Sequence, residues 1–107
     1  MPAERIPIPE LKKKLETNKK LVVVDVREPK EIKEGGAIPG AIHIPMDQIE
    51  KRIGELPKNA EIVFYCGGGG RASRAADSFL KAGYKTVQFC GIRDWKKEGL
   101  PTVPEIK

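Results

Sequence analysis

The sequence predicts an α/β protein, in which helices flank a doubly wound parallel sheet. Two apolar runs rich in β-branched and aromatic residues, at 21–26 and 61–65, are typical of strands buried on both faces of a sheet. Segments with helical periodicity alternate with such runs along the chain, as in consecutive βα units. Neither a repeat nor a linker separates them, so we expect residues 1–107 to form a single domain.

The first helix is expected at 9–17, because Pro9 suits a helix start and Leu11 and Leu15 are four residues apart. Lys12 to Lys14 are expected on its solvent face. Asn18 is expected to end it in the left-handed conformation.

A second helix is expected to begin at Asp47 and to end before Pro57, with Ile49 and Ile53 on its buried face. The clearest amphipathic pattern predicts a helix over 71–82, which Gly83 would cap. Shorter elements complete the pattern: a helical turn at 29–33, strands at 41–44 and 86–89, and a last helix at 92–98.

Composition narrows the class of ligand and the location. Twenty basic and 15 acidic residues give a net charge of +5, which favours anionic ligands. The lysine runs lack interleaved aromatic residues and there is no zinc-finger signature, so we expect no nucleic-acid partner.

The longest aliphatic run, 21–24, is too short to span a membrane, and 1–8 lacks the apolar core of a signal peptide. Two cysteines and one histidine make neither a disulfide framework nor a zinc site, so we expect a cytoplasmic protein without metal or cofactor.

The chemistry is expected at Cys66, which ends the second buried strand and precedes Gly67, Gly68, Gly69, Gly70 and Arg71. Ligands of open α/β sheets bind beyond the carboxyl ends of the strands. The four glycines can form a cup of inward-pointing N–H groups, which binds anions. The start of the following helix and Arg71 add positive charge, so all three features favour a nucleophilic thiolate. The alternative is an inert buried cysteine followed by a turn, but a turn needs fewer glycines.

The loop length separates two chemistries. Four residues lie between Cys66 and Arg71. Phosphatases that work through cysteine have a longer loop, which encircles a tetrahedral phosphate. The shorter cup favours a single terminal sulfur on Cys66, and it disfavours a phosphatase or an arsenate reductase.

Four segments in this order resemble the rhodanese family of sulfurtransferases over nearly the whole chain. They are 25–29 (DVREP), 36–45 (GAIPGAIHIP), the loop 66–71 (CGGGGR, matching C-x-x-G-x-R) followed by Ser73, and 91–95 (GIRDW) with 99–101 (GLP). The resemblance implies one rhodanese-like domain with a five-stranded parallel sheet. It also implies that Cys66 takes sulfane sulfur from thiosulfate, polysulfide or a persulfide, and passes it from a Cys66 persulfide to a thiol or cyanide.

Two positions depart from the family pattern. Ala37 stands where a histidine is usual, which we interpret as a loop-bracing position. Cys90 stands where glycine is usual. If its strand adjoins that of Cys66, Cys90 is either a second thiol that attacks the Cys66 persulfide or, as we favour, a small apolar residue.

Other residues are interpreted as structural. His43 lacks a positioned partner for acid–base work. Asp25 and Arg27 are expected to pair and to hold the strand end to the next loop, and Trp95 to pack the last helix. The main functional alternative to the enzyme is a sulfur carrier or interaction module, in which a sulfur-relay protein loads Cys66.

Overall fold

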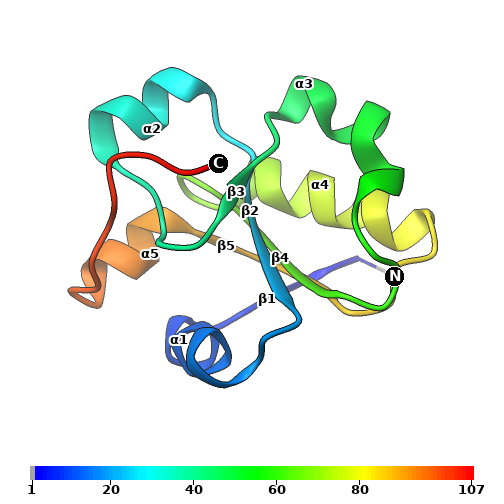
Figure 1. The fold of residues 1–107 in the computed structure, drawn as a ribbon, viewed down its shortest axis with the longest axis horizontal. Coiled ribbons are helices and arrows are strands. Elements are labelled where there is room, and N and C mark those ends of the chain that lie inside the picture. Colours follow the sequence, from blue (N-terminus) through cyan, green and yellow to red (C-terminus); the bar gives the residue numbers. More distant parts are fainter. Residues whose placement is uncertain (1) are drawn as a thin grey trace.

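The computed structural model describes residues 2–107 (Figure 1). Strands and helices alternate along most of the chain, as the sequence pattern predicts. In chain order the elements are β1 (Glu4–Arg5), α1 (Ile8–Thr17), β2 (Leu21–Asp25), α2 (Pro29–Gly35), β3 (Ile42–His43), α3 (Met46–Ile49), the 3₁₀ helix η1 (Glu50–Glu55), β4 (Glu61–Cys66), α4 (Gly70–Lys81), β5 (Val87–Gly91) and α5 (Ile92–Lys97).

The described strands form one sheet in the order β1-β5-β4-β2-β3, and every neighbouring pair is parallel. The predicted five-stranded parallel sheet is therefore confirmed. None of the predicted elements corresponds to β1, because a two-residue strand has no periodicity that the sequence could reveal. The long central strands β2, β4 and β5 end at the same edge, where the candidate loop begins.

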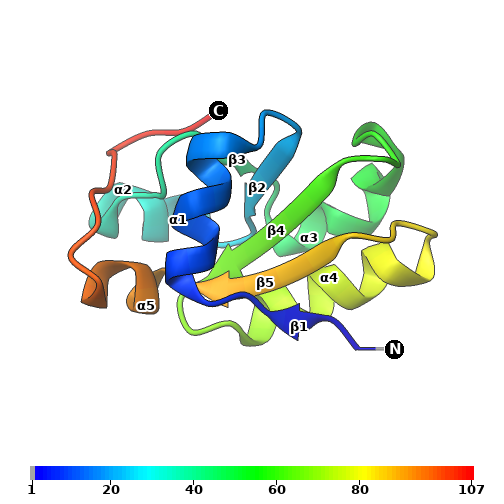
Figure 2. The ribbon, with the colours of Figure 1, turned by 90° about the horizontal axis from the view of Figure 1, so that it is seen from below.

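Helices cover both faces of the sheet (Figure 2), which confirms the doubly wound arrangement. Two cores result, and each is defined by its buried side chains. The first core joins the sheet to α3 and α4 and contains Val24, Val26, Ile44, Ile49, Ala60, Ile62, Phe64, Cys66, Ala72, Ala75, Ala76, Phe79, Tyr84 and Val87. The second core joins it to α1 and α5 and contains Ile6, Ile8, Leu11, Val23, Ile38, Ala41, Val63, Tyr65, Cys90, Ile92 and Trp95.

Three local expectations are wrong. The predicted helix from Asp47 is only a short α-helix that continues as 3₁₀ turns through η1. Asn18 ends α1 in an extended conformation, with its amide bonded to Glu61. Lys14 is half-buried, because its ammonium pairs with the Glu61 carboxylate of β4, and this hydrogen bond raises the pKa of Lys14.

The predicted pairing of Asp25 and Arg27 is confirmed. Their side chains are almost completely buried and joined at 2.7 Å. Arg27 also donates to the Gly36 carbonyl at 2.7 Å, so the end of β2 is tied to the loop that follows α2. A buried charge is tolerated when it is paired in this way.

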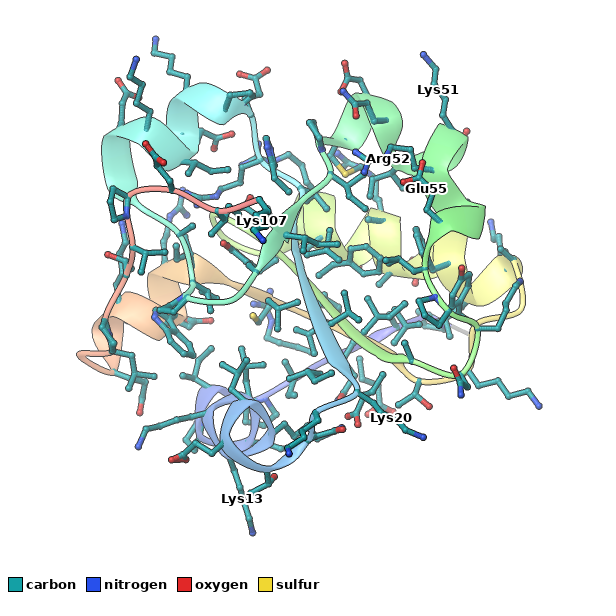
Figure 3. All side chains as sticks on the ribbon, in the orientation of Figure 1. Lys13, Lys20, Lys51, Arg52, Glu55 and Lys107 are labelled. Carbon is teal, nitrogen blue, oxygen red and sulfur yellow. The ribbon has the colours of Figure 1, made fainter. Side chains whose placement is uncertain are left out.

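Charged side chains extend from the outer surfaces, as Lys13, Lys20 and Lys51 do in Figure 3. Among residues 2–107, no helix has the length and apolar character needed to cross a membrane.

Candidate active site

Cys66 is the last residue of β4, and its side chain belongs to the first core beside α4. The chain then turns through a segment that we call the cysteine loop, residues 66–71. Within this loop the Gly69 N–H donates to the Cys66 sulfur at 3.0 Å. A backbone N–H donor aimed at sulfur can stabilise negative charge that develops on it.

Helix α4 begins directly behind this sulfur, at Gly70, and continues for 12 residues. Its start contributes partial positive charge beside Cys66. Of the four loop glycines, Gly69 alone has a positive φ, +116°, and it alone donates to the sulfur among the described hydrogen bonds. The expectation of a cup with several inward N–H groups is therefore only partly met in this structure.

The main partner of the Arg71 side chain is not the Cys66 sulfur. Its guanidinium makes two hydrogen bonds of 2.8 Å to the Glu31 carboxylate on α2. This interaction raises the pKa of Arg71 and lowers that of Glu31 to about 2. Glu31 also accepts the Glu28 N–H at 2.9 Å, which fixes its position. Glu31 is not among the residues predicted for the site, because 40 residues separate it from Arg71 in the sequence.

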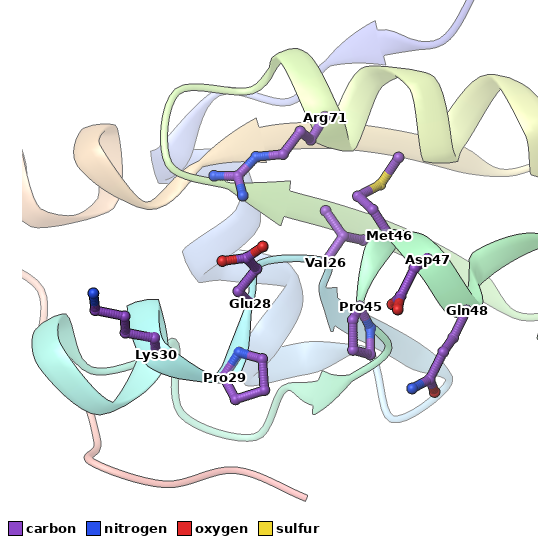
Figure 4. Close-up of a pocket in the computed structure, with 9 residues that line it drawn as sticks. All are labelled: Val26, Glu28, Pro29, Lys30, Pro45, Met46, Asp47, Gln48 and Arg71. Carbon is purple, nitrogen blue, oxygen red and sulfur yellow. The ribbon is translucent and has the colours of Figure 1, made fainter.

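A cavity of about 530 Å³ opens beside this ion pair. It lies between the starts of α2 and α3, and Arg71 reaches into it from α4 (Figure 4). The lining residues are Val26, Glu28, Pro29, Lys30, Pro45, Met46, Asp47, Gln48 and Arg71. Cys66 is only 2% exposed and is not among them, so the cavity borders the loop and not the sulfur itself.

Residues of two other elements also contact the cysteine loop. Arg5 of β1 donates to the Gly68 carbonyl at 3.2 Å, and the Arg93 N–H of α5 donates to the Gly67 carbonyl at 3.2 Å. The loop itself contains one charged residue, Arg71, but the fold adds two arginines around it. Nothing in the local sequence indicates that Arg5 and Arg93 meet there.

Gly91 is a further residue that the loop requires. It is paired with Cys66 in the sheet register. A Cβ atom on Gly91 would lie 2.7 Å from the Gly67 carbonyl oxygen and 2.9 Å from the Gly68 carbonyl carbon. Only glycine therefore lets the loop fold this closely over β5.

Cys90 lies on the strand next to Cys66, as expected, but its partner in the register is Tyr65. Its side chain belongs to the second core, on the opposite face of the sheet from Cys66. Burial raises the pKa of the Cys90 thiol to about 12. This placement fits the apolar packing role and gives Cys90 no direct path to the Cys66 sulfur.

The remaining candidates lie away from the loop. His43 Nε2 is 2.6 Å from the Arg27 carbonyl oxygen, and His43 borders a different cavity, beside the C-terminal segment. Trp95 packs in the second core and donates to the Pro101 carbonyl at 2.8 Å, which confirms its structural role. Ala37 is fully buried and exchanges two backbone hydrogen bonds with Val103. Its backbone therefore braces the loop that follows α2 against the C-terminal segment.

A cysteine held at a strand end by a loop amide and a helix start, on a doubly wound parallel sheet, is an arrangement suited to cysteine-based chemistry. The family model described as "Rhodanese-like domain" matches residues 8–98, and the chain belongs to this family.

Curated relatives carry names from sulfur transfer. A "Sulfurtransferase" of Allochromatium vinosum is 37% identical over 95 residues, which cover 87% of this chain and 88% of that protein. The "Putative sulfur carrier protein YrkF" of Bacillus subtilis is 42% identical over 86 residues, or 78% of this chain, but the match spans only 46% of YrkF. Among solved structures, the human single-domain sulfurtransferase TSTD1 superposes with a TM-score of 0.80 at 27% identity, covering 90% of this chain and 97% of that one.

Proposed function

We propose that this protein is a sulfurtransferase that carries sulfane sulfur as a Cys66 persulfide. The Cys66 thiolate attacks the outer sulfur of the donor, and the bond to the donor's leaving group breaks. With thiosulfate, the S–S bond breaks and sulfite leaves with the electron pair. An acceptor nucleophile then attacks the outer sulfur of the persulfide and regenerates the thiolate; cyanide would leave as thiocyanate.

The observation that supports this proposal most directly is the Gly69 N–H bonded to the Cys66 sulfur at the start of α4. The same donor and helix start would stabilise the terminal sulfur of a persulfide, which is also an anion. The names of the relatives support the same chemistry. A metal or organic cofactor has no part in these two steps.

The charge around the loop bears on the donor. Arg71 is largely neutralised by Glu31, so a dianion such as thiosulfate gains less attraction from it than from a free arginine. We propose that polysulfides and organic persulfides are donors at least as good as thiosulfate. Both cysteines are free thiols, which suits a reducing, cytoplasmic location.

Intact mass after incubation with a donor tests the proposal. Thiosulfate and polysulfide are added in separate reactions, to the wild type, to Cys66→Ala and to the matched control Cys90→Ala. We expect the wild type and Cys90→Ala to gain one sulfur atom, and Cys66→Ala to gain none. Loading of Cys66→Ala to the wild-type extent would refute the role of Cys66.

A sulfur-carrier role is the second candidate, and the similarity to a putative sulfur carrier protein favours it. In that role a partner protein loads Cys66 and free donors are not used. If neither free donor loads the wild type, a persulfide-bearing cysteine desulfurase is the next donor to test. Loading from that protein alone would establish the carrier in place of the enzyme.

A further inference from the structure

Three arginines reach the cysteine loop, and they differ in how their charge is used. Arg71 is bound by Glu31 through two hydrogen bonds. Arg5 pairs with Asp94 at 3.6 Å and donates to the Gly68 carbonyl. Arg93 is exposed and has no ion-pair partner among residues 2–107. Its charge is therefore the one most available to a ligand.

The Arg93 side chain occupies the space that side chains at positions 67 and 68 would fill. One terminal nitrogen lies 3.2 Å from the position of a Cβ on Gly68, and the other lies 3.7 Å from that of Gly67. The α5 backbone holds this arginine at the loop, since the Arg93 N–H is bonded to the Gly67 carbonyl. The α5 helix thus supplies a cation next to the glycines at 67 and 68.

Arg71 and Arg93 meet the loop at the same point. An Nη atom of Arg71 also lies 3.7 Å from the Cβ position of Gly67, the residue that directly follows Cys66. Two guanidinium groups this near to one point can hold an oxyanion by charge-assisted hydrogen bonds. An anion held there would place the rest of its molecule beside the sulfur of Cys66.

We propose that Arg93, with Arg71, binds the oxyanion group of the sulfur donor while its sulfane sulfur faces Cys66. That group is the sulfonate of thiosulfate or the carboxylate of an organic persulfide such as glutathione persulfide. The assignment of a sulfur donor rests on the proposed function. The assignment of an anion site beside Cys66 does not, and it can be tested separately.

Alkylation of Cys66 tests the anion site without any sulfur chemistry. Iodoacetate and iodoacetamide are similar in size and differ in charge, so the ratio of their rates at Cys66 reports the attraction of an anion. We expect Arg93→Gln to lower this ratio about five- to tenfold, the scale of the net contribution of one hydrogen bond. The control Lys97→Gln removes an exposed charge from the same helix and should change the ratio less than twofold.

Three outcomes decide the inference. A fall in the ratio for Arg93→Gln alone, with Arg93→Lys in between, supports it. An unchanged ratio, or an equal fall for Lys97→Gln, overturns it. A fall in both separate rates with a constant ratio also overturns it, because it would mean that Arg93 only stabilises the loop.

Donor kinetics then identify the source of the oxyanion. If wild type is loaded by thiosulfate or glutathione persulfide, Arg93→Gln should raise the KM for the donor whose anion it binds, with little change in kcat. An unaltered KM for both donors would overturn the donor assignment. If neither donor loads the wild type, the proposed function fails, whereas the alkylation ratio still tests the anion site.

Discussion

The two cysteines have different surroundings although they resemble each other in most simple measures. They lie on neighbouring parallel strands, one residue apart in register, and their exposed fractions are 2% for Cys66 and 0% for Cys90. Cys66 receives a loop N–H at the start of α4. Cys90 is enclosed in the second core, where burial raises its pKa to about 12. Hydrogen-bond partners and side-chain direction, not exposure, distinguish the proposed nucleophile Cys66 from Cys90.

The alternation of side chains along a strand accounts for this difference. Cys66 is the last residue of β4, whereas β5 continues one residue past Cys90 to Gly91. A shift of one residue turns a side chain to the other face of the sheet. The position beside Cys66 is therefore held by Gly91, which has no side chain, and the loop folds over it.

The largest expected contrast is in the reactivity of the two thiols. A pKa raised to about 12 leaves roughly one Cys90 thiol in ten thousand ionised at pH 8, and this fraction grows only as the pH approaches 12. We expect iodoacetamide to modify Cys66 at least a hundredfold faster than Cys90 at pH 8. Peptide mass spectrometry after timed quenching measures both rates in one sample.

Denaturant provides the control for this comparison. In the unfolded chain the two thiols lose their different surroundings, so their rates should converge. If Cys90 in the folded protein reacts as fast as Cys66, the second-thiol interpretation of Cys90 regains support.

The one-residue offset in register between the two cysteines could not be predicted from the sequence. The buried runs and the amphipathic helix placed β2, β4 and α4 correctly, and so located Cys66 at a strand end. The end of β5 was predicted at Phe89, two residues early, and this error hid the fact that Cys90 lies inside the strand. Strand ends depend on tertiary hydrogen bonds, which no local pattern records.

The charges around the loop could not be predicted for a similar reason. Glu31 and Arg93 are charged helix residues without a distinctive local pattern, and only the packing of α2 and α5 beside the loop brings them to it. Local sequence indicates which groups can react, whereas their partners are set by contacts between distant segments.

The next prediction concerns Gly91, which directly follows Cys90 and is paired with Cys66 in the sheet register. We expect Gly91→Ala to destabilise the protein by about 1–3 kcal/mol, since its methyl group would collide with backbone atoms that no side-chain rotation can move. The displaced loop should also load sulfur at least tenfold more slowly, because small misplacements of reacting groups are costly. Urea unfolding and the rate of mass gain measure the two effects.

Gly54→Ala is the matched control for Gly91→Ala. Gly54 lies in η1, has open space around its Cβ position and has no positive φ. Its replacement should leave loading unchanged. Normal loading by Gly91→Ala would show that the loop does not depend on its close approach to β5.

The smallest contrast lies within the loop, between Gly69 and Gly70. Gly69 has a φ of +116°, which strains any other residue, and it is the fixed glycine of the C-x-x-G-x-R pattern. Gly69→Ala should cost about 1–2 kcal/mol and slow loading several-fold, because the N–H bonded to Cys66 would shift. Gly70 has open space and begins α4, so Gly70→Ala should raise stability by a few tenths of a kcal/mol and leave loading unchanged. Thermal unfolding and intact mass compare the pair. Equal effects at both positions would mean that the loop needs glycine for general flexibility, and not for the one conformation that turns the Gly69 amide toward the sulfur.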